Sequence, residues 1–94
     1  MQGQQRAVRA RVSGTVQGVS YRFWTRSEAI RLGVTGWVRN EPDGSVTALI
    51  AGADAAVAAM VDRLWQGPRG ALVSKVEVEE MVHDQAPADF RIIT

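Results

Sequence analysis

A glycine-containing segment near the start of the sequence has the residue types and spacing of an anion site. It reads Gly-Thr-Val-Gln-Gly-Val-Ser-Tyr-Arg from Gly14 to Arg22, between a predicted strand and a predicted helix. The first backbone N–H groups of a helix lack intrahelical partners and lie at the positive end of its dipole, so they attract anions. Two glycines allow successive N–H groups to point at one centre. The spacing matches neither a Walker A loop nor GxGxxG.

Arg22 occupies a position where its charge is unfavourable unless an anion is bound. A cation in the first turn of a helix opposes the dipole by roughly 0.3–1 kcal/mol, and Arg26 follows one turn later. A phosphate between Arg22 and the loop would reverse this cost, because it matches both the guanidinium fork and a cluster of amides. The alternative is a solvated arginine beside an ordinary connecting loop. The loop alone does not decide between the two.

Asn40 is the second candidate, because it ends an apolar segment just before a turn. Taken alone it is an ordinary turn residue, since asparagine commonly begins turns. A functional role requires its carboxamide to face the Arg22 loop, which the predicted sheet allows. Asn40 could then aim a water molecule at an anion held by that loop.

Several catalytic groups are absent from the sequence. It has no cysteine and one histidine, His83, so a thiolate nucleophile, a Ser-His-Asp triad and a transition-metal site are not expected. A phosphate monoester has a poor leaving group and usually needs a metal, a covalent nucleophile or a strong acid. An acyl phosphate releases a carboxylate of pKa about 4, which departs without protonation. A phosphate cradle and an oriented water are enough for that reaction.

Hydrophobic periodicity predicts the elements that position these residues. Alternation of apolar and polar residues predicts strands at residues 6–13, 34–40, 46–50, 72–80 and 90–93. Helical spacing predicts one helix from Tyr21 to Gly33 and a second from Asp54, as its cap, to Gly67. This order, β-α-β-β-α-β with an extra terminal strand, predicts an α+β ferredoxin-like sandwich, an antiparallel sheet with two helices on one face.

The same periodicities identify the side chains that we expect in the core. They are Val8, Ala10, Val12, Tyr21, Thr25, Ala29, Leu32, Val57, Met60, Val61, Leu64, Val76 and Val78.

Composition indicates a single domain over residues 1–94, with residues 1–5 expected to be disordered. The hydrophobic fraction of 46% is too high for a disordered chain. A net charge of +1 gives no sign of a nucleic-acid partner, although ten of the eleven cationic residues are arginine. No apolar run is long enough for a signal peptide or a membrane span. We therefore expect a cytoplasmic protein without nucleic-acid or membrane partners. We also expect a monomer, although the sequence itself does not show the oligomeric state.

Two ordered motifs resemble the acylphosphatase family. The family shows Gly-x-Val-Gln-Gly-Val-x-Phe/Tyr-Arg and then, after a helix, Leu/Ile-Gly-x-x-Gly-Trp-Val-x-Asn. The first corresponds here to Gly14–Arg22 and the second to Leu32-Gly-Val-Thr-Gly-Trp-Val-Arg-Asn40. The later Asp43-Gly44-Ser-Val46 and Gly52 are also similar. The resemblance covers nearly the whole chain, and its distinctive part is residues 14–46.

The resemblance implies an acylphosphatase, which hydrolyses the carboxyl–phosphate bond of acyl phosphates to a carboxylate and inorganic phosphate. Arg22 and Asn40 would be the catalytic residues, Arg22 binding the phosphate with the loop amides and Asn40 orienting the attacking water. The phosphate-binding residues would be Gln17, Gly18, Val19, Ser20, Tyr21 and Arg22. No cofactor, metal or phosphoenzyme is implied. The only partners would be the small-molecule acyl phosphate and inorganic phosphate.

Two other classes of protein share the predicted topology. A non-catalytic module that binds an anionic effector or a partner would use a glycine loop and an arginine, but it would not need Asn40. An RNA-binding module would place aromatic residues on the exposed sheet face in a recognisable motif. The predicted strands lack that motif, so the RNA-binding class ranks last.

Overall fold

The computed structural model describes residues 5–82 and 86–93 of the 94-residue chain. The first strand already begins at Gln5, the last residue of the segment for which the sequence predicts disorder. Residues 1–4 and His83 lie outside the described residues.

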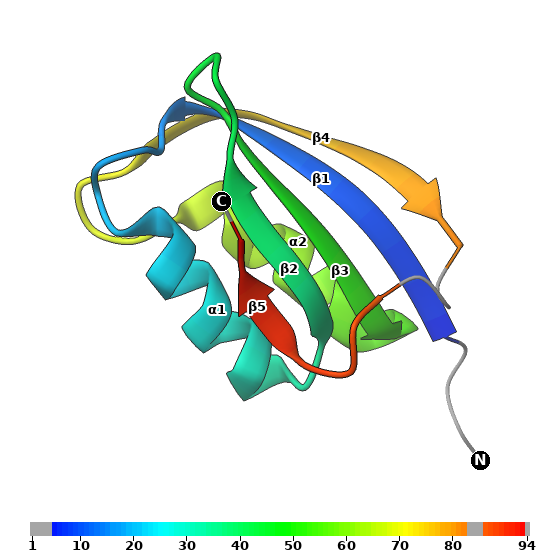
Figure 1. The fold of residues 1–94 in the computed structure, drawn as a ribbon. Coiled ribbons are helices and arrows are strands. Elements are labelled where there is room, and N and C mark those ends of the chain that lie inside the picture. Colours follow the sequence, from blue (N-terminus) through cyan, green and yellow to red (C-terminus); the bar gives the residue numbers. More distant parts are fainter. Residues whose placement is uncertain (1–4, 83–85, 94) are drawn as a thin grey trace.

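A layer of two helices covers one face of a sheet (Figure 1). The elements follow one another as β1 (Gln5–Thr15), α1 (Tyr21–Leu32), β2 (Thr35–Asn40), β3 (Val46–Ala53), α2 (Asp54–Gln66), β4 (Leu72–Met81) and β5 (Phe90–Ile92). This arrangement confirms the predicted ferredoxin-like sandwich. Over the described ranges, neither helix has the length and apolar character needed to cross a bilayer.

The C-terminal ends of β1 and β2 lie at the same end of the sheet. Its strand order is β4-β1-β3-β2-β5. Because β1 and β2 both pair antiparallel with β3, they run in the same direction. The loop after β1 and the turn after β2 therefore lie at one end of the sheet, as Figure 1 shows. This is the geometry that a joint role for the Arg22 loop and Asn40 requires.

One strand departs from the predicted antiparallel sheet. β5 runs parallel to β2, with Val38 opposite Ile92, so the five-stranded sheet is mixed. The other pairs, β1–β4, β1–β3 and β2–β3, are antiparallel as predicted. The direction of β5 was not predictable because the segment from β4 to β5 gives no sign of where its three residues dock.

The core lies between the helices and the sheet, and most of its predicted members are buried. The fully buried side chains among them are Val8, Ala10, Val12, Tyr21, Thr25, Ala29, Val57, Met60 and Leu64. Leu32, Val61 and Val76 are partly buried and pack against this cluster. The expectation for Val78 is wrong, since it is 41% exposed. β4 is an edge strand, and the outer side of an edge strand has no neighbour to cover it.

The start of α2 also differs from the prediction. The N-cap residue is Ala53, and no side chain caps the helix. Asp54 is instead the first helical residue, and its carboxylate lies 3.6 Å from a guanidinium nitrogen of Arg6. A carboxylate there still favours the helix, because it lies at the positive end of the dipole.

The face of the sheet away from the helices is lined by arginines. β3 is buried on both sides, and its open-face residues Leu49 and Thr47 are 5% and 7% exposed. Leu49 lies between Arg9 and Trp37 across the strands, and Thr47 lies between Arg11 and Arg39. Long arginine side chains can cover apolar surface with their stems while their charged ends stay in water. The arginines of this face therefore help to cover the central strand.

Candidate functional site

The candidate loop begins where β1 leaves the sheet. The pairing of β1 with β4 shifts register between Ser13 and Gly14. A Cβ atom at Gly14 would collide with the backbone carbonyl oxygen of Leu72, and its φ of 125° disfavours other residues. Gly14 thus allows β1 to approach β4 closely at the point where the loop leaves β1.

Two left-handed residues shape the loop itself. Gly18 has a φ of 75°, and Ser20, the N-cap residue of α1, has a φ of 62°. No side chain caps this end of α1. In the part of the chain that the structure describes, the amides of Gln17 to Ser20 donate to no backbone carbonyl. Left-handed residues within a short loop create a concavity of N–H groups that suits an anion.

Arg22 lies in the first turn of α1 with an uncommitted guanidinium. Among the described residues, no hydrogen bond or ion pair joins that group to another side chain or carbonyl. Arg26, one turn later, differs because its Nε donates to the carbonyl oxygen of Phe90, 3.2 Å away. Of the two cations that oppose the dipole of α1, Arg26 thus has a structural role, and Arg22 is available to a ligand.

Asn40 ends β2 with a buried acceptor atom. Its carboxamide oxygen Oδ1 has almost no contact with solvent and no hydrogen-bond partner among the described residues. An unpaired buried polar atom costs roughly 1–3 kcal/mol, and such atoms are uncommon in folded proteins. The position of this oxygen is explained if a bound molecule supplies the missing donor.

One hollow brings most of the candidate residues together. It has a volume of about 270 Å³ and is lined by Val16, Gln17, Gly18, Ser20, Tyr21, Arg22, Phe23 and Asn40. Val19, also expected at the site, is not a lining residue, because its side chain packs partly against the core. Two lining residues, Val16 and Phe23, were not predicted, and of these Phe23 is the exposed one. Its place outside the buried stripe of α1 was the available signal.

Tyr21 lines the hollow, and its side chain belongs to the core. The ring is fully buried, and the hydroxyl donates to the carbonyl oxygen of Leu64 at 2.7 Å. Burial raises the pKa of Tyr21. This hydrogen bond holds the first turn of α1 against α2, and it thereby fixes the direction in which the amides of that turn point.

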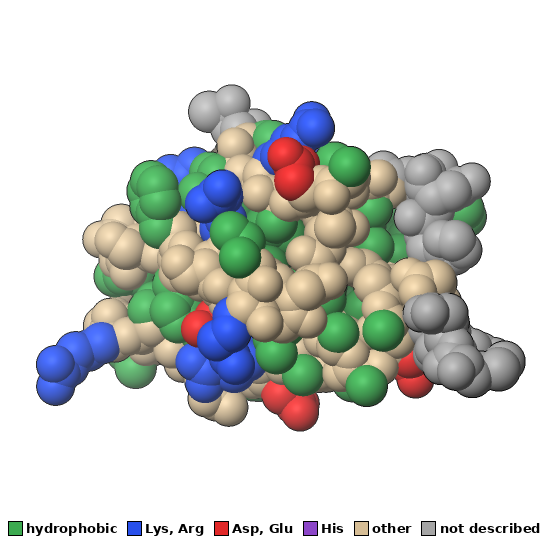
Figure 2. Space-filling model, turned by 90° about the horizontal axis from the view of Figure 1, so that it is seen from below, with side chains coloured by type: hydrophobic (Ala, Val, Ile, Leu, Met, Phe, Trp, Pro, Cys, Tyr) green, Lys and Arg blue, Asp and Glu red, His purple; other side chains and the backbone are tan. Residues whose placement is uncertain are grey.

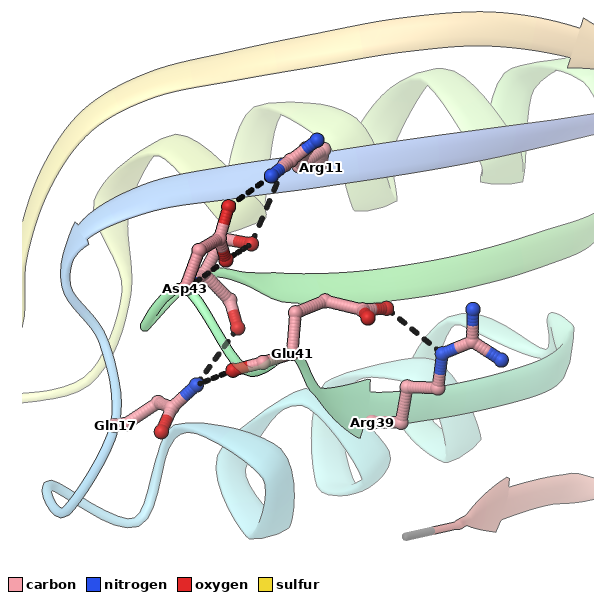
Figure 3. Close-up of polar contacts among 6 residues, drawn as sticks. Arg11, Gln17, Arg39, Glu41 and Asp43 are labelled. Atoms are coloured by element: carbon pink, nitrogen blue, oxygen red, sulfur yellow. Dashed lines mark hydrogen bonds and ion pairs between the residues drawn. The ribbon is translucent and has the colours of Figure 1, made fainter.

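The Gln17 side chain connects the loop to the turn that follows Asn40. Its Nε2 donates to the carbonyl oxygens of Glu41 and Ser45, at 2.8 and 2.9 Å (Figure 3). Sequence reasoning assigned only the backbone amide of Gln17 to the site. The spacing of the loop and the turn in the sequence gives no signal for this contact. It forms because the sheet brings the loop and the turn to the same end.

The turn after Asn40 is itself held by a polar network, drawn in Figure 3. Asp43 Oδ1 accepts hydrogen bonds from the Ser45 backbone N–H and hydroxyl, at 3.0 and 2.6 Å, and Oδ2 pairs with Arg11. The Ser45 contacts, and to a lesser extent Arg11, lower the pKa of Asp43 to about 2. Asp43 therefore stays ionised over the neutral range and keeps the turn closed.

These groups can bind a tetrahedral anion and a water beside it. Free amides and a guanidinium match phosphoryl oxygens, and the Asn40 oxygen can accept a hydrogen bond from water. Within residues 5–82 and 86–93, no group of three or more His, Cys, Asp or Glu could hold a metal ion.

A larger hollow, of about 710 Å³, lies on the open sheet face. Arginines line it, but carboxylates lie beside them: Arg9 bonds to Glu79 and Arg39 to Glu41, both at 2.7 Å. The Arg39 hydrogen bond also lowers the pKa of Glu41. This hollow thus offers paired charges, whereas the smaller one offers unpaired donors and an acceptor.

Several known proteins with similar sequences and folds are acylphosphatases. The Acylphosphatase family model matches residues 8–92. An acylphosphatase of Mesorhizobium japonicum is 68% identical over 93 residues, which cover 99% of both chains. The structure of an acylphosphatase from Coxiella burnetii, 37% identical, superposes with a TM-score of 0.90 over 95% of this chain and 93% of that one. The acylphosphatase of Bacillus subtilis, 30% identical, gives a TM-score of 0.91 over 95% of this chain and 99% of that one.

Proposed function

The chain belongs to the acylphosphatase family and is an enzyme that hydrolyses acyl phosphates. We propose that it does so by direct attack of water on a phosphoryl group held by the loop of residues 17–22. In this proposal Arg22 and the loop amides bind the phosphoryl oxygens, and Asn40 orients the water. Membership of an enzyme family favours the hydrolase over the non-catalytic module that the topology alone left open.

The observation that carries the proposal is that Asn40, whose carboxamide oxygen is unpaired, lines the same hollow as Arg22, whose guanidinium is uncommitted. The oxygen can accept one hydrogen bond from a water, which leaves a lone pair of that water directed elsewhere. The phosphorus of a bound phosphoryl group is the electrophile available to that lone pair. Both partners are then held before the reaction, which lowers its entropic cost.

The reaction is a single displacement at phosphorus. A bond forms between the water oxygen and phosphorus while the bond between phosphorus and the carboxyl oxygen breaks. The electron pair of the broken bond leaves with the carboxylate, and the water gives up its protons to the phosphate product and to solvent. No acid is required, because a carboxylate of pKa about 4 is stable as an anion at neutral pH.

Arg22 acts on the charge that the phosphoryl oxygens carry during the displacement. Its planar fork can bind two oxygens at once, which a lysine ammonium cannot do. The loop amides add donors that are already oriented, because Gln17 ties the loop to the turn and Tyr21 ties the helix start to α2. Donors fixed in advance need no reorganisation as charge develops, and this is their advantage over water.

The enzyme acts as a cytoplasmic monomer on a small molecule, without metal, cofactor or phosphoenzyme, and binds neither nucleic acid nor membrane. The residues that bind acyl phosphate also bind the product, inorganic phosphate, which should inhibit competitively.

Turnover of acetyl phosphate and benzoyl phosphate, with and without EDTA, tests the metal-free mechanism. We expect equal rates in both conditions, and a rate lost with EDTA would overturn the mechanism.

Hydrolysis in ¹⁸O-labelled water tests the point of attack. The label should enter inorganic phosphate and not the carboxylate, while acid quenching should trap no phosphoenzyme. Label in the carboxylate would mean attack at the acyl carbon.

A further inference from the structure

Phe23 is a large apolar side chain that the core does not use. It is 67% exposed and follows Arg22 directly in the first turn of α1. It also lines the hollow that contains Arg22 and Asn40. Two other apolar residues of that hollow, Val16 and Tyr21, are fully buried, so Phe23 is the lining residue that offers accessible apolar surface.

Exposure alone would not make Phe23 unusual. Ile30 lies on the same helix with 57% of its surface exposed, and single exposed apolar residues are normal. On the face shown in Figure 2, hydrophobic side chains are likewise spread among polar atoms. The difference is position, because Ile30 does not line the hollow and Phe23 does.

The substrate has two ends that need different surroundings. With the phosphoryl group on the amides and Arg22, the acyl group occupies the rest of the hollow, which Phe23 lines. In-line displacement also places the leaving carboxylate on the side of phosphorus away from the water. Asn40 approaches the hollow from β2, whereas Phe23 approaches it from α1.

We propose that Phe23 is a specificity-determining residue that packs against the acyl group and favours acyl phosphates with an aromatic acyl group over acetyl phosphate. This inference depends on the proposed function, because it takes the phosphoryl position from it. An aromatic acyl group can stack on the ring or meet its edge, and such pairs are favourable beyond the area that they bury. A methyl group covers little of the ring and gains little.

The contact exists in the bound substrate as well as during the reaction. Such uniform binding lowers KM and leaves kcat nearly unchanged. For one aromatic pair at an open rim, we expect an effect of roughly 3- to 10-fold. The binding of inorganic phosphate, which has no acyl group, should not depend on Phe23.

The test compares kcat/KM for benzoyl phosphate and acetyl phosphate in the parent chain, Phe23→Ala, Phe23→Leu and the control Ile30→Ala. Comparison between variants cancels the different intrinsic reactivities of the two substrates. The benzoyl-to-acetyl ratio should fall roughly 3- to 10-fold in Phe23→Ala, through KM, and by less in Phe23→Leu. Ile30→Ala should keep the parent ratio, and every variant should keep the inhibition constant of phosphate.

Each other outcome contradicts a definite statement. If the parent hydrolyses both substrates and Phe23→Ala leaves the ratio unchanged, the inference is wrong and the proposed function stands. A ratio that falls together with phosphate binding would show that Phe23 supports the cradle instead of the acyl group. If the parent hydrolyses neither substrate, the proposed function fails, and this inference fails with it.

Discussion

The arginines at the two hollows of the molecule differ in whether they have bonding partners. On the open sheet face, Arg9 bonds to Glu79, and Arg11 bonds to Ser45 and pairs with Asp43. At the loop end, Arg22 has no such partner among the described residues. The larger hollow is therefore the one whose charges are already neutralised, and the smaller one retains unused binding capacity.

This difference shows that unused polar groups identify a candidate site better than size does. The paired arginines lie across from Leu49 and Thr47 of the central strand, so they have a structural use there. Their exposed ion pairs each contribute roughly 0–1 kcal/mol. Arg22 and Asn40 have no comparable use in the fold, and a free guanidinium beside an unpaired buried oxygen is explained by a ligand. Substitutions at the two hollows test this difference.

Replacement of Arg22 should have the largest effect. Arg22→Ala should abolish measurable turnover and weaken the binding of inorganic phosphate, and Arg22→Lys should also fail because a point charge cannot replace the fork. Phosphate should raise the melting temperature of the parent chain by mass action and leave that of Arg22→Ala unchanged. Turnover assays and phosphate-dependent melting curves measure both effects.

Arg9→Ala is the matched control for Arg22→Ala, since it removes the same group from the other hollow. It should keep turnover within about twofold, because an exposed ion pair contributes little. A loss of activity in Arg9→Ala as large as that in Arg22→Ala would remove the distinction between the two regions.

Replacement of Asn40 should separate activity from binding and from stability. Asn40→Ala should lower kcat by roughly 10²–10³, the cost of removing one hydrogen bond that acts in the transition state. The phosphate inhibition constant should stay the same. The melting temperature should rise, because the variant removes a buried polar atom that has no partner. Kinetics with phosphate as inhibitor and a melting curve test the three statements.

The neighbouring Arg39 supplies the control on the same strand. It projects to the open face, where its guanidinium lies 4.8 Å from the centre of the Trp37 ring. Arg39→Ala should therefore keep the parent kcat. If Asn40→Ala loses rate and phosphate affinity equally, the separate roles assigned to Asn40 and Arg22 are wrong.

Replacement of Gln17 should have an intermediate effect on activity, because Gln17 positions the loop relative to the turn after Asn40. Gln17→Ala removes two hydrogen bonds to the turn carbonyls, worth roughly 1–2 kcal/mol of unfolding free energy together. Because the loop and the turn behind Asn40 are then no longer tied, kcat/KM should fall about tenfold, a smaller loss than for the groups that touch substrate. Denaturant unfolding and steady-state kinetics provide the two readouts.

Gln66→Ala is a suitable comparison, because it removes a carboxamide whose described contact is an exposed hydrogen bond from Arg63 of the same helix. Its activity should equal that of the parent. A Gln17→Ala variant with full activity would show that the loop keeps its shape without the bridge.

Sequence reasoning identified the backbone framework and could not identify the side-chain pairing. The periodicity that buries Val8 and Met60 depends only on local spacing, and it correctly gave the order of helices and strands. The docking of β5 and the exposure of Val78 depend on which strands become neighbours at the edges of the sheet. Local patterns carry no information about those neighbours.

The candidate site shows the same division. The positions of Arg22 and Asn40 followed from motifs, and the strand order puts their elements at one end of the sheet. Which of the ten arginines form ion pairs depends on contacts such as that of Arg9 with Glu79, seventy residues apart, and no spacing rule predicts them. The bridge from Gln17 to the turn is invisible in the sequence for the same reason.

Replacement of Asp43 should have the smallest effect and should depend on pH. Its folded pKa of about 2 lies below the ordinary value of 3.8, so the carboxylate contributes stability that is fully present above about pH 4 and is lost as pH falls through 2. Asp43→Asn should melt slightly below the parent at pH 7, and the gap should close between pH 4 and pH 2. Its kcat should remain close to that of the parent, because the carboxamide oxygen of the variant would still accept the Ser45 hydrogen bonds.

A difference in melting temperature that stays constant down to pH 2 would assign the difference to packing instead of charge. A kcat loss like that of Asn40→Ala would mean that the paired network on the open face takes part in catalysis, and the contrast between the two regions would no longer hold.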